Sequence, residues 1–433
     1  MSEKTILVGL ERPRVARWEL LESLEELGQL SLTAGAEVVA TVTQRLERPT
    51  APYYIGKGKA EELALLCEDK KATSIIFDDE LTPAQGRNLE VLCKRKVIDR
   101  TQLILDIFAA RARTREGRLQ VELAQLQYLL PRLTHMWGHL SRQSGGVGSR
   151  GPGETQLEVD RRRAQERVAR LKEDLQSVRR IRQTQREGRL RQQWPLVSLV
   201  GYTNAGKSSL LNLLTKSAVL EEDLLFATLD PTTRQLVLPN HQKILLTDTV
   251  GFIRKLPHTL VASFKATLEE VELADLLLHV VDLSHPHYLD QIEAVEKILK
   301  EIGAAEKKCL IIFNKIDCIP HPDLIQRELK RFPNSVAISA RFGLGKEEFL
   351  SRLEQELSSL RVEGCYYLPP EASALLAEIH RSGHVSSLRY DGETAVVTAS
   401  VPISLEKRLE PFGTKKFTGI EEIEGTEEDF KKN

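Results

Sequence analysis

A glycine-rich segment that follows an apolar run constrains this chain more than any other feature. The segment reads Gly201-Tyr-Thr-Asn-Ala-Gly-Lys207-Ser208, and the residues before it, Leu196–Val200, are typical of a buried strand. The residues after it favour a helix, so the glycines are expected to wrap a strand-to-helix turn around phosphate groups, with backbone amides pointing inward. The helix amino terminus adds partial positive charge. A doubly wound α/β domain with a phosphate-binding loop is therefore expected.

Two side chains of this loop are expected to act directly on a bound nucleotide. Lys207 should bridge the β- and γ-phosphates, and the Ser208 hydroxyl should bind Mg²⁺. The segment Phe226-Ala-Thr228-Leu-Asp-Pro-Thr232-Thr233 offers three threonines for a second Mg²⁺ ligand. Thr228 is the preferred candidate and Thr232 the second, and at least two of the three are expected to bond only to the loop backbone.

A second motif, Asp248-Thr-Val-Gly251, follows the apolar run Lys243–Thr247, about 40 residues after Lys207. An aspartate there can hold Mg²⁺ through water, and the Gly251 amide can donate to the γ-phosphate. The next residue, Phe252, cannot orient a water molecule and is interpreted as a hydrophobic plug. Slow intrinsic turnover is therefore expected, accelerated by a partner or by a monovalent cation, with Asn204 as a candidate potassium ligand.

A third motif, Asn314-Lys315-Ile316-Asp317, follows the apolar run Cys309–Phe313. The Asp317 carboxylate can accept two hydrogen bonds from guanine, which adenine cannot donate. Asn314 should brace the loop and meet N7, the Lys315 stem should stack under the base, and a backbone amide at Ser339-Ala340 should reach O6. The ordered motifs indicate hydrolysis of GTP with Mg²⁺, where catalysis is mainly positioning and charge stabilisation.

Composition narrows the class of protein without naming a partner. The 433 residues are too many for one compact core, so two to four domains are expected. The 61 basic and 62 acidic residues almost cancel, five scattered cysteines lack metal-ligand spacing, and no run of 18 apolar residues occurs. These features favour a reducing compartment and no transmembrane helix. The amino terminus lacks a signal-peptide pattern, so a cytoplasmic location is expected, with peripheral membrane association left open.

Hydrophobic patterns divide the chain into four predicted domains. Residues 1–115 alternate strand-like and helix-like runs, which indicates a small α/β domain with a parallel sheet. Residues 116–194 contain two amphipathic helices on either side of a glycine-rich tip, which predicts a helical hairpin. Residues 195–362 are the phosphate-loop domain. Residues 363–433 are predicted to form a small α+β domain with a helix near 371–381, two strands near 387–389 and 395–401, and an acidic tail.

The predicted hairpin carries a local excess of positive charge. Between Arg142 and Arg191 the chain has 14 Arg or Lys against 7 Asp or Glu. Arginine-rich segments attract phosphate backbones, and the flexible tip 145–153 has room to enter a folded RNA. Two alternatives stay open: an ordinary solvated pair of helices with salt bridges, and a signalling GTPase whose hairpin binds a protein effector. An attached RNA-modifying enzyme is disfavoured, because no second catalytic constellation is visible in the sequence.

The motifs together resemble those of the HflX family of translation-associated GTPases. The strings GYTNAGKSSLLN, FATLDPTTR, DTVGFI and NKID are similar to that family's nucleotide-binding motifs. SGGVGSRGPGETQLEVDRR is similar to its glycine-rich loop and helix, and Tyr54-Ile-Gly-Lys-Gly-Lys-Ala is similar to its first subdomain. The resemblance covers about residues 1–360.

The resemblance implies a two-part amino-terminal domain, a GTPase domain and a small carboxy-terminal domain. It implies a monomer that binds the large (50S) ribosomal subunit, with ribosomal RNA contacted through the hairpin. It also implies splitting or rescue of stalled or idle ribosomes under stress, or a part in ribosome biogenesis. Some relatives also hydrolyse ATP through the amino-terminal domain. This chain has no phosphate-binding loop motif there, only the short Gly56-Lys57-Gly58-Lys59, so that activity is left open.

The resemblance also implies a set of functional residues. Lys207, Thr228 and Gly251 are the implied catalytic groups, and Ser208 and Thr228 are the implied Mg²⁺ ligands. The implied nucleotide contacts are Gly201, Tyr202, Thr203, Asn204, Ala205, Gly206, Lys207, Ser208, Phe226, Ala227, Thr228, Leu229, Asp230, Asp248, Thr249, Val250, Gly251, Asn314, Lys315, Ile316, Asp317, Ser339, Ala340 and Arg341.

Overall fold

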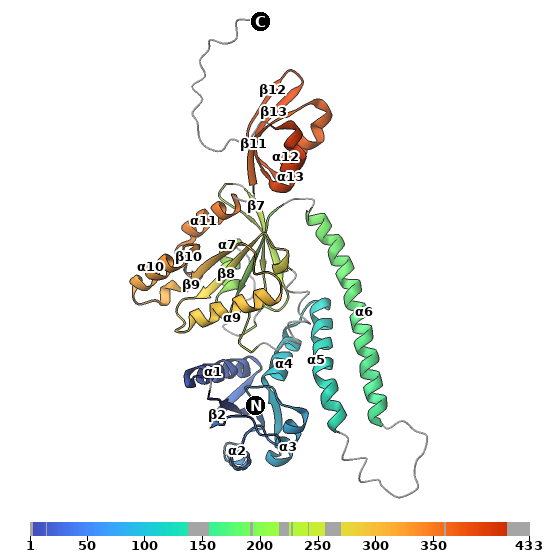
Figure 1. Cartoon of the computed structure of the whole chain (residues 1–433), viewed down its shortest axis with the longest axis vertical. Coiled ribbons are helices and arrows are strands. Elements are labelled where there is room, and N and C mark those ends of the chain that lie inside the picture. The colour runs from blue at the N-terminus through green and yellow to red at the C-terminus, as the bar shows by residue number, and fades with distance from the viewer. Residues whose placement is uncertain are drawn as a thin grey trace. The chain divides into compact units, whose positions relative to one another are not determined.

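The computed structural model describes residues 3–136, 156–190, 194–215, 225–255, 270–358 and 361–413, except positions 14, 227 and 241. Within these residues the chain forms three sheets and divides into two compact units (Figure 1). The first unit comprises Met1–Gln185, Leu196–Leu236 and Leu245–Phe349, and the second comprises Arg186–Pro195, Val237–Ile244 and Leu350–Asn433. Among the described helices, none is long and apolar enough to cross a membrane.

The amino-terminal part of the first unit is a parallel sheet with the strand order β2-β1-β3-β4. Strands β1 and β3 are almost continuous buried runs, as expected for a sheet that is covered on both faces. A capping box between Thr82 and Gln85 begins helix α3. The predicted α/β region with a parallel sheet is confirmed. Its elements are β1 (Glu3–Glu11), α1 (Arg17–Thr33), β2 (Ala36–Arg45), α2 (Lys57–Asp69), β3 (Ser74–Phe77), α3 (Pro83–Cys93), β4 (Lys96–Asp99) and α4 (Arg100–Arg111).

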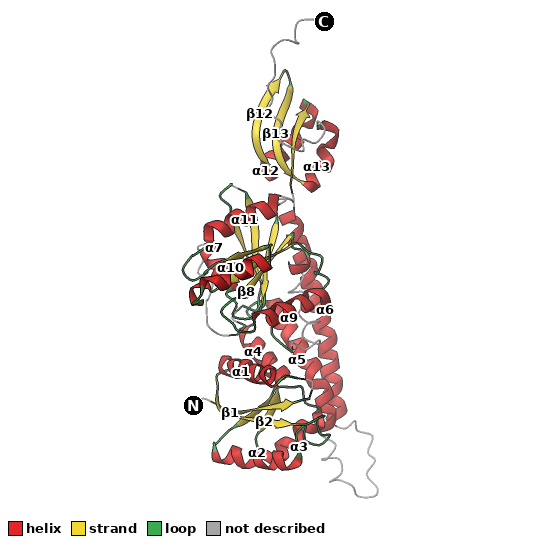
Figure 2. Cartoon of the chain, turned by 60° about the vertical axis from the view of Figure 1, so that its left-hand side comes forward, coloured by secondary structure: helices red, strands yellow, loops and turns green. Residues whose placement is uncertain are grey.

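Two long helices follow, α5 (Arg115–Met136) and α6 (Gln156–Leu190), and both views draw them side by side (Figures 1 and 2). Arg167 and Glu122 form a bidentate ion pair between the helices, with N–O distances of 2.7 and 2.8 Å. An apolar seam lies between the two helices, whereas the glycine-rich tip 145–153 lies outside the described residues. The seam consists of Leu119, Leu123, Leu126, Val168, Leu171 and Leu175.

The phosphate-loop region forms a six-stranded sheet with the order β10-β9-β8-β5-β7-β6. Parallel pairings join β10 to β9, β9 to β8, β8 to β5 and β5 to β7, which confirms the expected mostly parallel sheet. The strands expected at Leu196–Val200, Lys243–Thr247 and Cys309–Phe313 are present. The strands are β5 (Leu196–Gly201), β6 (Thr232–Val237), β7 (Lys243–Asp248), β8 (Leu276–Asp282), β9 (Cys309–Asn314) and β10 (Ser335–Ala337). The helices are α7 (Lys207–Thr215), α9 (Tyr288–Glu301), α10 (Pro322–Arg331) and α11 (Lys346–Ser358).

One hydrophobic core cluster of the first unit joins the amino-terminal helices to the loops around the phosphate-binding segment. Phe108 of α4 and Phe226 meet edge to face, with their ring centroids 4.6 Å apart. Tyr202, Phe252 and Phe226 belong to this cluster and are almost completely buried. The loops that surround the nucleotide motifs therefore share their packing with helices far away in the sequence.

The second unit contains an antiparallel sheet with the order β11-β13-β12. Its elements are β11 (Arg361–Leu368), α12 (Ser373–Ser382), β12 (His384–Asp391), β13 (Thr394–Pro402) and α13 (Ile403–Leu409). The predicted helix and the two predicted strands are present, but β11 was not predicted. Gly364 interrupts its apolar pattern, and the strand forms by pairing with β13, which lies more than 25 residues later in the chain. The predicted boundary at residue 363 falls inside β11, and the four predicted domains otherwise stay a prediction.

Candidate nucleotide-binding site

The phosphate-binding loop runs from Gly201 at the end of β5 to Lys207 at the start of α7. Two of its glycines have positive φ, 149° at Gly201 and 95° at Gly206. A Cβ at Gly201 would lie 2.2 Å from the Val280 oxygen, and one at Gly206 would lie 2.1 Å from Asn314 Nδ2. Both positions therefore require glycine for steric as well as torsional reasons.

The Lys207 ammonium group is buried inside the curve of this loop. Its Nζ donates to the Tyr202 oxygen at 2.8 Å and to the Gly201 oxygen at 3.2 Å. Burial lowers the pKa of Lys207 to about 8, and the nearby Asp248 carboxylate acts in the opposite direction. Among the described residues this cation is held by two carbonyl oxygens near a carboxylate, so it is well suited to bind phosphate oxygens, whose negative charge would raise its pKa toward the ordinary value.

Three oxygen-bearing side chains meet at the beginning of α7. Ser208 Oγ donates to Asp248 Oδ2 at 2.7 Å, Thr228 Oγ1 donates to the same oxygen at 3.1 Å, and the two hydroxyls lie 2.9 Å apart. Burial raises the pKa of Asp248, although Lys207 and the two hydroxyls act in the opposite direction. Asp248 Oδ1 is buried and has no hydrogen-bond partner among the described residues. Such a set of hard oxygen atoms fits Mg²⁺.

The structure also places the other two candidate threonines. Thr232 is the first residue of β6, and Thr233 Oγ1 lies 3.0 Å from Thr247 Oγ1 on the neighbouring strand. Thr228 alone of the three is in contact with Ser208 and Asp248. This geometry agrees with the preference for Thr228, whose role as a ligand stays a prediction.

The loop after β7 lies directly against the phosphate-binding loop. Thr249 Oγ1 donates to the Leu199 oxygen at 2.6 Å, and Thr203 N donates to the Phe252 oxygen at 2.8 Å. A Cβ at Gly251 would lie 2.8 Å from Thr203 Cα and 2.9 Å from Lys207 Nζ, so the Gly251 backbone is close to where a γ-phosphate would bind. The Phe252 side chain is 2 % exposed and belongs to the hydrophobic core cluster, which agrees with its interpretation as a plug.

The base-recognition residues lie on the loops after β9 and β10. The buried Asn314 donates from Nδ2 to the Ala205 oxygen at 2.8 Å and accepts at Oδ1 from Ala340 N at 2.9 Å. It therefore braces the phosphate-binding loop and the loop Ser339–Arg341 at once, as expected. Partial burial raises the pKa of Asp317, but the hydrogen bonds from Ser339 and Cys318 outweigh it, so the pKa lies below its usual value. The exposed carboxylate is thus ionised and available to a base.

Lys315 is held by an ion pair rather than left free. Its φ is 62°, and its Nζ lies 2.7 Å from Asp282 Oδ2 at the end of β8. This pair holds the ammonium end of the lysine side chain beside the end of β8, and the expected stacking of its stem under a base stays a prediction. Ile316 belongs to the short 3-10 helix Ile316–Cys318 that presents Asp317.

Several residues of the predicted contact set have buried side chains that pack against other parts of the protein. Phe226 and Leu229 are buried in the hydrophobic core cluster, and Ala227 lies outside the described residues. Tyr202 points its hydroxyl toward α1, where it donates to Glu26. These three side chains take part in packing between loop and helix, and their contacts with a nucleotide stay a prediction.

Asp230 has a partner that the sequence did not indicate. Its Oδ2 accepts from Arg113 N and Thr114 N, both at 2.9 Å, and its Oδ1 accepts from the Thr114 hydroxyl. A Cβ at Gly117 would lie 2.5 Å from Asp230 Oδ1, so glycine makes room for this carboxylate. Asp230 therefore binds the backbone just before helix α5, and an acidic group there is stabilised by the helix dipole.

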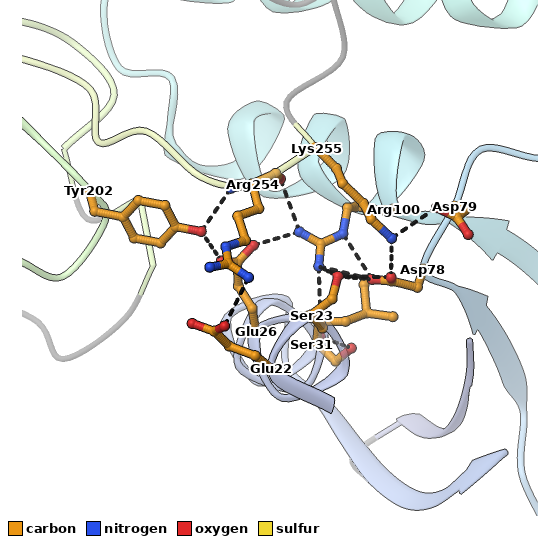
Figure 3. A network of polar contacts seen from close by, with 11 residues as sticks. Glu22, Ser23, Glu26, Ser31, Asp78, Asp79, Arg100, Tyr202, Arg254 and Lys255 are labelled. Atoms are coloured by element: carbon orange, nitrogen blue, oxygen red, sulfur yellow. Dashed lines mark hydrogen bonds and ion pairs between the residues drawn. The ribbon is translucent and has the colours of Figure 1, made fainter. Parts of the chain in front are cut away.

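A polar network links the loop after Phe252 to the amino-terminal sheet (Figure 3). Arg100 is 2 % exposed and donates to the Arg254 oxygen at 3.2 Å and to Asp78 Oδ1 at 2.9 Å. Lys255 forms ion pairs with Asp78 and Asp79, and Arg254 N donates to the Tyr202 hydroxyl at 2.8 Å. Sequence reasoning missed these residues, since no local pattern relates positions that are up to 177 residues apart.

Three family models match consecutive parts of the chain. A model described as GTP-binding GTPase N-terminal matches residues 21–109, and one described as GTP-binding GTPase Middle Region matches residues 111–189. A model described as 50S ribosome-binding GTPase matches residues 196–315.

Similar proteins cover almost the whole chain. A protein named GTPase HflX from Caldanaerobacter subterraneus subsp. tengcongensis is 46% identical over 411 residues, which are 95% of this chain and 94% of that protein. GTPase HflX from Escherichia coli strain K12 is 46% identical over 362 residues, 83% of this chain and 85% of that protein. A solved structure of a GTP-binding protein from Sulfolobus solfataricus in complex with GDP is 26% identical, with a TM-score of 0.44, over 82% of this chain and 99% of that chain.

Proposed function

This chain belongs to the HflX family of GTPases and hydrolyses GTP, and from that premise we propose that it binds the large ribosomal subunit. We propose further that it splits or rescues stalled or idle ribosomes under stress, or acts in ribosome biogenesis, as a cytoplasmic monomer. The observation that carries this proposal is the match of residues 196–315 to a model described as 50S ribosome-binding GTPase.

The helix pair α5–α6 supports ribosomal RNA as the contact. Arg161, Arg162 and Arg163 are exposed on α6, and Arg170 and Lys172 follow on the same helix. A long helix that exposes several cations and few aromatic side chains is better suited to bind a phosphate backbone than to stack on single-stranded bases. The tip 145–153 is the proposed point of entry into folded RNA.

The contacts of Asp230 support the proposal that ribosome binding depends on the nucleotide state. Thr228 lies in the proposed Mg²⁺ site, and Asp230, two residues later, holds the backbone at Arg113 and Thr114 before α5. A loop that rearranges on hydrolysis would release this carboxylate from α5. The nucleotide state would thereby alter the helix pair that is proposed to bind RNA.

Ser208 and Thr228, with Asp248 through water, would hold Mg²⁺, which when bound neutralises charge on the β- and γ-phosphates. Lys207 would bind the same phosphates, and the Gly251 amide would donate to the γ-phosphate. These groups position the nucleotide and stabilise developing charge without covalent chemistry by the protein.

Asp230→Ala is expected to reduce the nucleotide dependence of ribosome binding. The wild-type chain should cosediment with 50S and 70S particles more strongly with a non-hydrolysable GTP analogue than with GDP. The variant should lose this difference, on the order of tenfold, because a typical coupling free energy is about 1–3 kcal/mol. Asp323→Ala, which removes an exposed aspartate from the first turn of α10, is the matched control and should keep the difference.

Salt dependence separates the proposal from its rival, a GTPase whose helix pair binds a protein effector. Phosphate contacts weaken steeply as salt rises, whereas protein contacts weaken less. Deletion of residues 145–153 should also weaken cosedimentation. If the chain does not cosediment with ribosomal particles in either nucleotide state at low salt, ribosome binding is contradicted. If binding survives the deletion unchanged, the role of the tip in entering RNA is contradicted.

We also propose that potassium accelerates hydrolysis. Asn204 is exposed at the tip of the phosphate-binding loop with a φ of 60°, where its carbonyl-type oxygen can reach a cation. Phosphate release should be several-fold faster in potassium than in sodium, and Asn204→Ala should remove most of the difference. Equal rates in the two salts would rule out this role for the cation.

A further inference from the structure

Both polar groups of the Arg254 backbone are bonded to side chains from distant parts of the chain (Figure 3). Arg254 N donates to the Tyr202 hydroxyl at 2.8 Å, and the Arg254 oxygen accepts from Arg100 Nη1 at 3.2 Å. The Tyr202 hydroxyl donates in turn to Glu26 Oε2, and Glu26 Oε1 accepts from Arg100 Nη1 at 2.5 Å. Glu26, Arg100, Tyr202 and Arg254 therefore close a circle of hydrogen bonds, which we call the hydrogen-bonded ring.

The hydrogen-bonded ring is buried and its charges are compensated. Tyr202 is 6 % exposed and Arg100 is 2 % exposed. Burial and the Glu26 carboxylate raise the pKa of Tyr202 above its usual value, so the hydroxyl keeps its proton and donates it. Arg100 also pairs with Asp78 at 2.9 Å. Hydrogen bonds to charged groups are strong when they are shielded from water, so the ring is a stiff connection.

Tyr202 joins this ring to the phosphate-binding loop. It is the second residue of that loop, and it forms an isolated parallel bridge with Phe252. In this bridge Phe252 N donates to the Gly201 oxygen at 3.1 Å, and Thr203 N donates to the Phe252 oxygen at 2.8 Å. Arg254, two residues later, is held by the Tyr202 hydroxyl. The segment after Gly251 is therefore fixed to the phosphate-binding loop at two points.

This fixed segment begins directly after Gly251, so it determines where the Gly251 backbone lies. An added Cβ at Gly251 would lie 2.9 Å from Lys207 Nζ, which places that backbone beside the lysine. The Gly251 amide and Lys207 are the groups proposed to hold the γ-phosphate. Because catalysis of phosphoryl transfer is mainly positioning, a shift of Gly251 relative to Lys207 would slow the reaction.

We propose that Tyr202 is a positioning residue for GTP hydrolysis, which holds the Gly251 amide in place through the hydrogen-bonded ring. Glu26 of α1 and Arg100 of α4 thereby take part in the order of a nucleotide loop. Without the Tyr202 hydroxyl, the Arg254 amide loses its acceptor and the segment after Gly251 gains freedom. The transition state is then stabilised less, while the other phosphate contacts remain. This inference rests on the proposed role of the Gly251 amide and not on ribosome binding.

Tyr202→Phe tests the inference, because it removes the hydroxyl and keeps the phenyl group in the hydrophobic core cluster. In the full chain, without ribosomes, kcat for GTP hydrolysis should fall on the order of 10- to 10²-fold, as a small misplacement of a catalytic group causes. KM for GTP and the calorimetric affinity for GDP should stay within about threefold of the wild type, since only the transition state loses a contact.

Tyr128→Phe is the matched control. Tyr128 is a buried tyrosine of the same hydrophobic core cluster, and its hydroxyl is hydrogen-bonded to Asp99. The control should lower the thermal stability about as much as Tyr202→Phe does and leave kcat unchanged. Equal losses of kcat in the two variants would assign the effect to general destabilisation and overturn the positioning role.

Glu26→Gln tests whether the hydroxyl acts through the hydrogen-bonded ring. A glutamine amide has one acceptor oxygen, so it cannot accept from Tyr202 and Arg100 together as the carboxylate does. This variant should also lower kcat, and the double variant with Tyr202→Phe should be at most about threefold slower than the slower single variant, because changes within one network do not add. Losses that multiply in the double variant would contradict the ring.

Gly251→Ala distinguishes failure of this inference from failure of its premise. Its Cβ would lie 2.8 Å from Thr203 Cα, so the variant should lose hydrolysis. If Gly251→Ala is inactive and Tyr202→Phe keeps the wild-type kcat, positioning by Tyr202 is overturned and the role of Gly251 stands. If Gly251→Ala keeps the wild-type kcat, the role of Gly251 fails and the inference fails with it. A loss of GDP affinity in Tyr202→Phe would also overturn the inference, since the residue would then shape the binding loop.

Discussion

Asp317→Asn is expected to lower the affinity for GDP on the order of 10²- to 10³-fold, because each hydrogen bond to a charged group contributes about 1.5–3 kcal/mol. The carboxylate accepts from the N1 and N2 groups of guanine, whereas an amide presents one acceptor and one donor. The same change should create affinity for xanthosine diphosphate, whose C2 oxygen accepts a hydrogen bond where guanine donates one. Calorimetric titration with GDP, ADP and xanthosine diphosphate measures both effects.

The position of Asp317 makes this a clean test of base recognition. The residue is exposed, and its described hydrogen bonds come from Ser339 and from Cys318 Sγ at 3.4 Å, so the fold should not depend on it. Asp323→Asn removes an exposed carboxylate from α10 and serves as the control. A wild-type chain with no preference for GDP over ADP, or a variant that keeps it, would refute the assignment of Asp317.

Gly206→Ala is expected to abolish nucleotide binding, with a loss on the order of 10³-fold or more, which corresponds to about 4 kcal/mol. The new Cβ would lie 2.1 Å from Asn314 Nδ2 at a φ of 95°. Asn314 would have to move, and its bonds to the Ala205 oxygen and to Ala340 N would break. The phosphate and base halves of the site would therefore be disturbed together. Binding of a fluorescent GDP derivative measures the loss.

Gly303→Ala separates steric conflict from backbone strain. Gly303 also has a positive φ, 77°, but an added Cβ would meet no atom within 4 Å. Its replacement should cost about 1–2 kcal/mol of stability through the left-handed torsion and leave GDP affinity unchanged. If Gly206→Ala bound GDP as tightly as Gly303→Ala does, the close approach between Gly206 and Asn314 would not matter for binding.

The regular elements of the nucleotide site were predictable because their signals are local. Leu196–Gly201 is a mostly apolar strand followed by a glycine-rich turn and a helix, and Cys309–Asn314 is a second mostly apolar strand that leads into the base-recognition loop. The order of these segments along a parallel sheet places their carboxyl ends on one edge. By contrast, β11 was not predicted, because Gly364 interrupts its local pattern and the strand is defined by its pairing with β13.

The sequence by itself determined which chemistry this chain performs, since the phosphate loop, the Asp248–Gly251 motif and the Asn314–Asp317 motif each carry their function within a few residues. Only the tertiary structure decided which helices the nucleotide-binding loops contact. Asp230 meets Thr114 across 116 positions, and Arg100 meets Arg254 across 154. Such contacts depend on the packing of helices α1, α4 and α5 against the loops, and side chains that are polar and isolated in the sequence give no periodic signal of where that packing will place them.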